Sequence, residues 1–536
     1  MRELEEQLGI QFASKFQAMD EQFCEQRKPQ IVLPEGPVTI KSAASDIARA
    51  IAPAERIFSR DGSAWHLRED VNGVCELHPV RAAKARSLFE DYCKFVKRKT
   101  LKDGKEKYIP EVMSEMSAKA ILESEAFING LLEIRGISRV PFPLVDNGGD
   151  FRLVENGYDA ETKILVCGNS KSIFSELSVN QAVSIIRLLY ADTKFMTESD
   201  KARCISNLLT PAFRRAGLIG KRIPMEVTEA DRSQSGKTLL QQIKAAVYGD
   251  RPAYVNERKN GVGSTDESFS AALLSGRPFV LLDNFRGKIN LTSLESFLTA
   301  DGKFDCRALR TNGSVDPENY FLGMTSNGAE MTKDLANRSC FVRIRKRPDG
   351  YEFRDYGDQE FIDYVRSNHE IFLSAIYSIL RHWNESGRPK TGETSHSFRS
   401  WSRVMDWIVQ NYFGLPRLLE GHEEASQRTI SPHLSFLRDF LILLSDEDDF
   451  ESCSFRASDL AEKCIEKDIR IPGLPLSLEN DSDKRNMAMG KILKSTMCEK
   501  NELKLEGFLI KRKKVSKIKA GSSSSKEHWE YRFSRL

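Results

Sequence analysis

The sequence predicts an α/β fold whose central part is a parallel sheet flanked by helices. An apolar run at residues 223–227 is followed by a turn and then by a helix-like pattern. Two later apolar runs, 278–282 and 320–324, end in polar residues. Continuous apolar runs are typical of strands that are buried on both faces of a parallel sheet. Segments with helical spacing lie before and after these runs, at 178–220 and beyond residue 361, and strands that alternate with helices favour this architecture.

A phosphate-binding loop is predicted where the first of these strands meets its helix. Backbone N–H groups at a helix N-terminus point at an anion, and the helix dipole favours negative charge there. We expect Lys237 to reach the β- and γ-phosphates of a nucleoside triphosphate and the Thr238 hydroxyl to bind Mg²⁺. Asp231 replaces the usual first glycine of such a loop, so a plain surface turn is the alternative when the loop is taken alone. The expected cofactor-binding residues are Ser233, Gln234, Ser235, Gly236, Lys237, Thr238 and Leu239.

An acidic residue ends the second predicted strand. Asp283 follows the apolar run 278–282, and open α/β sheets bind their ligands at the carboxyl ends of the strands. We therefore expect Asp283 to lie beside Thr238 and to order the metal ion. A strand that is capped by an Asx-turn at Asp283 and Asn284 is the alternative.

An amide and an arginine complete the ordered set. Asn327 follows the third predicted strand, where an amide beside the phosphate strand can contact the γ-phosphate or orient the attacking water. Arg338 follows a short helix and is placed to act as an arginine finger in a neighbouring subunit's site, stabilising charge on the transferred phosphoryl group. Taken singly, Asn327 is also consistent with a turn and Arg338 with a solvated cation. The order of loop, acid, amide and arginine favours the nucleotide site.

From about residue 153 to the C-terminus, the chain resembles the AAA+ and superfamily-three-type helicases of phages, plasmids and chromosomal islands. That family includes the helicase half of prophage primase–helicases and the MCM-like cassette helicases. The order of the motifs carries the resemblance. The motifs lie at residues 156–162, 228–240, 282–284, 307–309, 325–327, 334–338, 406–414 and 530–534.

The resemblance implies a ring-forming ATPase, expected to be a hexamer, that uses ATP and Mg²⁺ to translocate on single-stranded or forked DNA. Its expected setting is the replication of a phage, plasmid or mobile element, and a separate primase is left open as a partner. By the same resemblance, Lys237, Thr238 and Asp283 keep the phosphate and metal roles given above. Asn327 is then the first sensor and Arg338 the trans-acting finger.

Four further positions concern catalysis. Asp231 would repel the phosphates unless Arg232 or a loop amide compensates. Asn284 holds the catalytic position where many members of the family carry the glutamate that polarises water, and an amide cannot act as a base. Glu295 is a candidate for the catalytic carboxylate, and slow hydrolysis is the alternative. Arg307 is a candidate for a further phosphate sensor or an intersubunit contact.

Two segments are candidates for DNA contact. Residues 304–314 contain Asn312-Gly313 between extended runs, which is a strong hairpin signal, and in related helicases such a hairpin projects into the central channel. Arg310, near the expected tip, is the candidate residue, and an ordinary surface hairpin is the alternative.

The C-terminal segment is the second candidate. Helices at 455–461 and 484–497 precede strands at 508–514 and 529–533, which predicts a winged helix. A basic strand beside an aromatic one suits contact with the backbone of duplex or forked DNA. Docking of a protein is the alternative. The expected DNA-binding residues here are Lys511, Arg512, Lys513 and Lys514.

Six parts are expected along the chain. They are an N-terminal helix at 1–28, an α+β domain at 29–168, a helical linker at 169–222, an AAA+ ATPase core at 223–348, a helical lid at 349–445 and the winged-helix domain at 446–536. Within the second part, Asp61-Gly62 predicts a hairpin turn. Residues 96–107 form a basic run beside aromatic residues, which is consistent with DNA contact but more simply with a solvated loop.

The composition is that of an intracellular globular protein. The chain has 536 residues, of which 40% are hydrophobic and 29% charged, and its net charge of +3 argues neither for nor against DNA. The charged N-terminus lacks the apolar core of a signal peptide, and no stretch reaches the length of a membrane span. The ten cysteines include no C-x-x-C pair, so structural zinc and disulfides are not expected. We expect a cytoplasmic protein with no membrane partner.

Two functions from different classes remain open. The first is an ATP-driven DNA helicase. The second is a non-translocating AAA+ nucleotide switch, such as a DNA-binding regulator or a defence-associated ATPase, which Asp231 and Asn284 keep open. A small-molecule kinase is disfavoured because it would not need the Asn327–Arg338 set or a winged helix.

Overall fold

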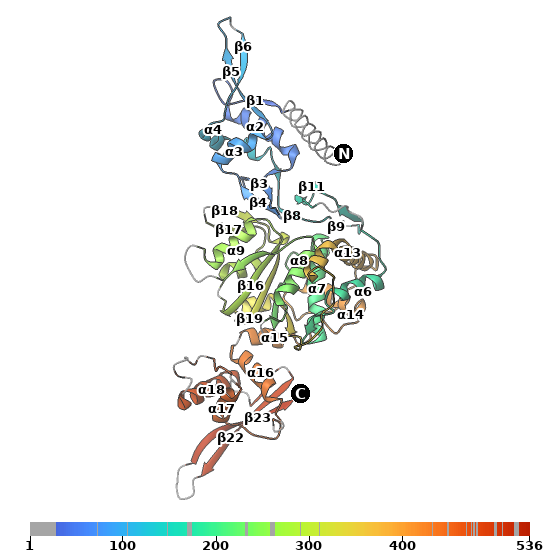
Figure 1. The fold of residues 1–536 in the computed structure, drawn as a ribbon, viewed down its shortest axis with the longest axis vertical. Helices are drawn as coiled ribbons and strands as arrows, with labels where there is room; N and C mark the ends of the chain where they lie inside the picture. The colour runs from blue at the N-terminus through green and yellow to red at the C-terminus, as the bar shows by residue number, and fades with distance from the viewer. Residues whose placement is uncertain are drawn as a thin grey trace, which may run out of the picture.

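The computed structural model of the chain has three parts in a row, and the central sheet lies in the middle part (Figure 1). The expected helix at 1–28 lies outside the described residues, which begin at Lys28. The structure describes residues 28–71, 73–103, 105–146, 148–168, 174–230, 234–257, 263–289, 291–309, 311–430, 432–447, 450–467, 469–472, 474, 478, 481–497, 501–505, 507–518 and 525–536.

The middle part is built on a six-stranded sheet in the order β13–β20–β14–β19–β16–β15. Every neighbouring pair is parallel except the edge strand β13, which runs antiparallel to β20. This confirms the predicted parallel sheet with flanking helices. The strands are β13 (Lys194–Phe195), β14 (Met225–Ala230), β15 (Ala253–Asn256), β16 (Phe279–Lys288), β19 (Phe321–Glu330) and β20 (Ser339–Arg345).

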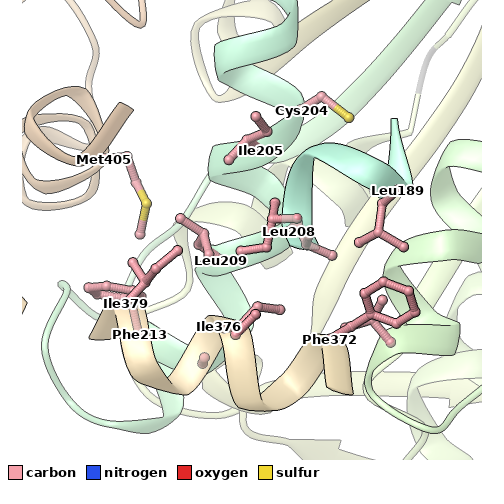
Figure 2. Packing of buried hydrophobic residues seen from close by; sticks show 14 of the residues in the cluster. Leu189, Cys204, Ile205, Leu208, Leu209, Phe213, Phe372, Ile376, Ile379 and Met405 are labelled. Atoms are coloured by element: carbon pink, nitrogen blue, oxygen red, sulfur yellow. The ribbon is translucent and has the colours of Figure 1, made fainter. Parts of the chain in front are cut away.

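Two apolar cores cover the two faces of this sheet, because successive side chains of a strand point to opposite faces. In β20, Val342 belongs to one core and Phe341 to the other. Figure 2 shows the first core, in which α7, α13 and α14 interlock. Helices of the first core are α6 (Val179–Leu189), α7 (Glu198–Arg215), α8 (Lys237–Val247), α12 (Phe361–Ser367), α13 (His369–Glu385) and α14 (Arg399–Asn411). Helices of the second core are α9 (Thr265–Leu274), α10 (Thr292–Thr299) and α11 (Lys333–Asn337).

Polar contacts fix α8 on the sheet. Lys244 on α8 forms a buried ion pair with Glu226 on β14, at 2.6 Å between Nζ and Oε2. The Gln241 amide donates to the Thr228 hydroxyl over 2.9 Å. The Gln241 side chain passes so close to β19 that a Cβ on Gly323 would lie 2.2 Å from its Oε1 atom. Breaking a buried ion pair costs about 3–5 kcal/mol, so α8 and β14 are held as one unit.

A tyrosine hydroxyl supports α7 next to an internal proline. Pro211 lies inside this helix, where proline removes a backbone donor and crowds the preceding turn. The Tyr248 hydroxyl, at the C-terminal cap of α8, accepts from Ala212 N over 3.2 Å and donates to Leu208 O over 2.9 Å. It therefore bridges the amide and the carbonyl that an unbroken helix would join directly.

The N-terminal part contains two sheets, β1–β5–β6 and β4–β3–β2–β7, packed with helices. The predicted turn at Asp61-Gly62 is confirmed, because both residues have positive φ between the paired strands β2 and β3. The elements are β1 (Gln30–Val32), α2 (Ile40–Ile51), the 3-10 helix η1 (Ala52–Ala54), β2 (Ile57–Arg60), β3 (Ser63–Glu69), β4 (Cys75–Pro79), α3 (Ala82–Glu90), β5 (Lys94–Thr100), β6 (Glu106–Pro110), α4 (Glu115–Leu122), α5 (Glu125–Ile128) and β7 (Leu132–Glu133).

Short strands and a hairpin join this part to the middle sheet. Asp61 accepts from Ser314 N over 3.0 Å, and Arg60 donates to the Tyr320 hydroxyl over 2.8 Å. These contacts attach the β2–β3 turn to the hairpin β17–β18. The joining elements are β8 (Gly136–Ser138), β9 (Phe142–Val145), β10 (Phe151–Val154), β11 (Gly157–Asp159), β12 (Ile164–Val166), β17 (Phe304–Ala308), β18 (Thr311–Val315) and the 3-10 helix η2 (Pro317–Asn319).

The C-terminal part has its own apolar core, formed by helices and a three-stranded antiparallel sheet. The sheet contains one strand more than the sequence predicted, β21. Arg456 is the N-cap residue of α17, and Asp459 accepts from its backbone N over 2.7 Å. Helix α15 (His422–Ile430) packs against α11, β19 and β20 of the middle part. The elements of the C-terminal part are α16 (Pro432–Leu444), α17 (Ala457–Glu466), α18 (Ser482–Met497), β21 (Glu502–Leu505), β22 (Phe508–Ile518) and β23 (Ser525–Arg535). Across the described residues, no helix has the length and apolarity that crossing a membrane requires.

Gly323→Ala is expected to lower the free energy of unfolding by about 1–3 kcal/mol, the usual cost of overpacking. The new Cβ displaces Gln241, which is buried and cannot swing away without losing its bond to Thr228. Urea unfolding measures the change. Gly392→Ala is the matched control, since a Cβ there meets no atom within 4 Å. Equal stability of the two variants would contradict the packing account.

Candidate functional site

The loop between β14 and α8 has the backbone that a phosphate cradle needs. Gln234 has φ of 60° and Gly236 has φ of 88°, and Gly236 is the N-cap residue of α8. A glycine adopts such a left-handed conformation without strain. The loop therefore directs the N-terminus of α8, with its first N–H groups, to the carboxyl edge of the sheet. Asp231, Arg232 and Ser233 lie outside the described residues.

Asp283 on β16 binds side chains from two other chain segments. Its Oδ1 atom accepts from the Thr238 hydroxyl of α8 over 2.9 Å and from the Thr325 hydroxyl of β19 over 2.6 Å. Because β19 lies between β14 and β16, Thr325 fills the space that separates the phosphate loop from the acidic strand. The structure thus brings Thr238 and Asp283 together, and Thr325 is a member of the cluster that sequence reasoning missed.

A β-bulge positions Asp283. The pairing of β16 with β19 shifts between Leu282 and Phe285, and Asn284 has φ of 57° within this bulge. Asparagine tolerates this left-handed conformation better than most residues. The Asn284 backbone N donates to the Thr325 hydroxyl over 2.7 Å. The strand continues to Lys288, so the Asx-turn that would have ended it at Asp283 is not formed.

The oxygen atoms at this cluster fit Mg²⁺, which prefers carboxylate, hydroxyl and water oxygens and is held by one or two carboxylates together with substrate phosphates. Thr238 and Asp283 would hold the ion. Among the described residues, no group of three or more His, Cys, Asp or Glu side chains forms a separate metal centre.

A second carboxylate, Glu229, lies at the same edge of the sheet. It is the penultimate residue of β14 and pairs in register with Ser326 of β19 and Arg343 of β20. Burial raises the pKa of the Glu229 carboxyl, against the lowering effect of Arg438 and Arg343. The Thr429 hydroxyl donates to it over 3.3 Å. Its place directly before the phosphate loop is the signal that could have identified it.

The other proposed catalytic positions are placed as follows. Asn284 is exposed, and its Oδ1 atom accepts from Arg286 over 3.4 Å. Asn327 lies in β19 directly after Ser326, which pairs with Glu229. Glu295 on α10 accepts from the hydroxyl of Thr332, the N-cap residue of α11. The Glu295 carboxylate is thus used to hold the helix that leads to Arg338.

Arg338 lies at the opposite edge of the sheet from the phosphate loop. Met225 N, at the amino end of β14, donates to Arg338 O over 3.1 Å, whereas the loop follows the carboxyl end of β14. Six residues of strand at about 3.3 Å each separate the two edges by about 20 Å. The Arg338 side chain is 22% exposed and pairs with Asp334 over 3.2 Å. It does not reach the phosphate loop of its own chain.

A cavity of about 650 Å³ adjoins the phosphate loop. It is lined by Gln234, Ser235, Gly236 and Leu239 on one side and by the loop at residues 346–360 on the other. This volume is in the range of small-molecule and cofactor sites. Residues 346–360 are not helical, although the sequence predicted a helical lid from residue 349.

Aromatic and charged residues of that loop shape the cavity. Tyr351 donates to Asp192 over 2.9 Å, and the Arg347 guanidinium lies 4.3 Å from the centre of the Tyr351 ring. Phe353 packs edge-on against Tyr351 yet is 66% exposed. The density of aromatic and arginine residues in a polar segment was the available signal for this cavity.

The hairpin β17–β18 turns at a different place from the predicted one. Ala308 pairs with Thr311 and Arg307 with Asn312, so Asn312 and Gly313 lie within β18 and not at a turn; Arg310 lies outside the described residues. Gly313 is within β18, where its bare Cα lets Leu274 and Trp65 approach to 3.2 and 3.4 Å of the Cβ position. The glycine therefore serves close packing instead of a turn. Arg307 is exposed on β17. The chain runs from β17 through β18 and η2 to the amino end of β19, so this hairpin lies away from the phosphate loop.

Ion pairs neutralise part of the positive charge on the basic strand β22. Lys511 pairs with Glu502 over 2.9 Å, and Lys514 pairs with Glu527. Arg512 lies over the Trp529 ring, 4.6 Å from its centre, and Lys513 is exposed and pairs in register with Glu530. The positive charge predicted for residues 511–514 is therefore partly neutralised within the sheet.

Comparisons with known proteins find only weak structural similarity. No family model and no curated protein matches the chain. A solved structure described as "SCCmec type IV Cch - active helicase" is 12% identical, covering 85% of this chain and 83% of that one, with a TM-score of 0.30. The A-form apo structure of the NrS-1 C-terminal region is 11% identical, covering 80% and 88%, also with a TM-score of 0.30. Likeness at this level does not establish a common fold, so the function is argued from the site.

Thr325→Val is expected to weaken Mg²⁺-dependent ATP binding about tenfold, which corresponds to about 1.4 kcal/mol. Valine has nearly the shape of threonine but leaves Asp283 with one donor and the Asn284 amide without its acceptor. Titration of a fluorescent ATP analogue with and without Mg²⁺ measures the effect. Thr325→Ser, which keeps the hydroxyl, is the control and should bind nearly as the wild type. Wild-type affinity of the valine variant would show that the Thr325 hydroxyl does not order Asp283.

Proposed function

We propose that this protein is an ATP-hydrolysing motor that translocates on DNA, built on an AAA+ core with a helical lid and a C-terminal winged helix. The observation that carries the proposal is the convergence of Thr238 and Thr325 on Asp283, beside a left-handed glycine loop. A Lys-Thr pair at a helix N-terminus with an acid at a neighbouring strand end is the arrangement that binds the phosphates and Mg²⁺ of a nucleoside triphosphate. The adjoining cavity has room for the nucleoside.

The location of Arg338 supports an oligomer, expected to be a hexameric ring. A cation about 20 Å from its own phosphate loop cannot stabilise charge there, but it can complete the site of the next subunit. Asn337, next to it, lines an open cleft of about 990 Å³ together with Arg399 and Arg417. Glu393, Glu420 and Glu423 also line this cleft, and Arg417 pairs with Glu393 over 3.5 Å, so the proposal of an oligomer rests on the position of Arg338 and not on the charge of the cleft.

Two segments are proposed to contact DNA. The β17–β18 hairpin carries an exposed Leu309 in its turn and has Arg310 as its neighbour. In the C-terminal part, Arg512 lies over the ring of Trp529, which is 39% exposed, and Lys513 is exposed on the opposite face of β22. Because Lys511 and Lys514 are paired with acids, we assign the larger share of this contact to the exposed Lys513.

We further propose Glu229 as the catalytic carboxylate. The Asn284 amide cannot take a proton, and Glu295 is bonded to Thr332. Glu229 lies directly before the phosphate loop, and a carboxyl whose pKa is raised toward neutrality is suited to accept a proton from water. The Asn284 amide also favours a second function, a nucleotide switch that binds ATP and assembles without turnover.

Lys237→Ala and Arg338→Ala are each expected to lower DNA-stimulated ATP turnover and the unwinding of a forked duplex, on the order of 10³-fold for Arg338→Ala. Each variant lacks a different half of the site, so mixing the two inactive proteins should restore part of the turnover. ATPase and strand-separation assays on the separate and mixed proteins test this. No recovery on mixing would remove the trans assignment of Arg338. Assembly with ATP but no turnover in the wild type would favour the switch.

Glu229→Gln is expected to lower ATP turnover at least tenfold at neutral pH while keeping the bond from Thr429. The folded pKa of Glu229 lies above its unfolded value, so the wild type loses stability as the pH rises through the folded pKa. The glutamine variant does not titrate and should lack this loss. Turnover and urea unfolding, both followed against pH, measure the two effects. Glu295→Gln is the control, and a larger loss of turnover there would reassign the carboxylate.

A further inference from the structure

The β5–β6 hairpin projects from the N-terminal part at one end of the molecule (Figure 1). Phe95 and Val96, at its base, are buried, and β5 pairs there with β1. From Arg98 to Tyr108, every described side chain is exposed. The outer half of this hairpin therefore contributes nothing to the apolar core, and its sequence is free to serve another purpose.

Cations dominate the outer hairpin. Residues 97–111 contain six Lys or Arg residues and three acids. All three acids are engaged: Glu111 pairs with Lys97, Glu106 with Arg98 over 2.9 Å, and Asp103 with Lys105 over 3.9 Å. Among the described residues, no carboxylate lies within 4 Å of Lys99, Lys102 or Lys107 to balance the remaining charge.

The register of the hairpin places two of these lysines directly opposite each other. Lys99 pairs with Lys107 across the strands, on the same face. Like charges in directly opposite positions destabilise a strand pair, by roughly 0.2–1 kcal/mol. The fold gains nothing from this arrangement, whereas an anionic ligand would gain from both charges.

Apolar exposure accompanies the charge. Tyr108 is 50% exposed on the face opposite to Lys107, and Leu101 at the turn is 41% exposed. An aromatic ring among uncompensated lysines suits contact with sugars and bases beside a phosphate backbone. A two-stranded ribbon also has the width that the major groove of B-form DNA admits.

We propose that the β5–β6 hairpin is a second DNA-binding element, which enters a groove of duplex DNA with Lys99, Lys102 and Lys107 on the phosphates. It lies at the opposite end of the molecule from the β22–β23 hairpin (Figure 1). The two elements therefore contact separate stretches of DNA. This inference goes beyond the proposed motor function and does not depend on ATP turnover.

The test compares the full-length triple variant Lys99→Gln, Lys102→Gln, Lys107→Gln with the matched variant in which the same lysines become arginine. Binding to a fluorescent duplex is followed by anisotropy over a range of KCl concentrations. Each phosphate contact contributes about −0.9 to the slope of log K against log[salt]. The slope of the glutamine variant should therefore be shallower by about 2–3, and its affinity at low salt should be at least tenfold lower. The arginine variant should keep both.

Further readouts separate this site from the motor. ATP turnover without DNA should be equal in the wild type and both triple variants, because the hairpin is remote from the phosphate loop. Tyr108→Ala should weaken duplex binding without changing the salt slope, whereas Tyr108→Phe should not weaken it. Unchanged duplex affinity and slope in the glutamine variant would overturn the proposal, including in the case that the hairpin binds an acidic protein segment instead.

Discussion

A single carboxylate oxygen holds the candidate site together. Asp283 Oδ1 receives hydrogen bonds from Thr238 and Thr325, so α8, β19 and β16 are joined at one atom. Hydrogen bonds to a charged acceptor are each worth about 1.5–3 kcal/mol, enough to fix the loop before any ligand arrives. β19 lies between the phosphate strand and the acidic strand, so its Thr325 side chain adds a second donor to the direct bond between Thr238 and Asp283. Preorganisation of this kind lowers the cost of ordering a metal and its phosphates.

Local chemistry explains which elements could be predicted. The buried strands, the turn at Asp61-Gly62 and the helix that begins beside Gly236 each depend on neighbours in the chain, and the sequence alone identifies them. Asn312-Gly313 shows the limit of the method. The dipeptide has the composition of a turn, yet Trp65 and Leu274, which come from distant segments, require a glycine there. Tertiary packing decided the outcome, and a single sequence does not display it.

The candidate site was predictable to a similar extent. Thr238 and Asp283 carry recognisable motifs, and the structure brings them into contact. Thr325 and Glu229 lie within the motifs at 325–327 and 228–240, but the motifs give them no role, because their importance comes from strand order and burial. The basic run at residues 511–514 illustrates the converse case. Its charge was evident, but the partners Glu502 and Glu527 lie on neighbouring strands and become visible only when the sheet is assembled. Net charge along a segment therefore overstates the charge that a folded surface presents.

The bridge made by Tyr248 has a mechanical consequence. Its hydroxyl is part of the hydrogen-bond ladder of α7, while its backbone caps the helix that leaves the phosphate loop. If α8 slid or rotated alone, the Leu208 carbonyl and the Ala212 amide would lose their bridge in an interior without water, at about 1–3 kcal/mol for each orphaned group. Helices α7 and α8 must consequently move together. A displacement at the N-terminus of α8 would thereby be passed on to α7 and to α14, which packs against α7, while α13 contacts both α7 and α8 (Figure 2).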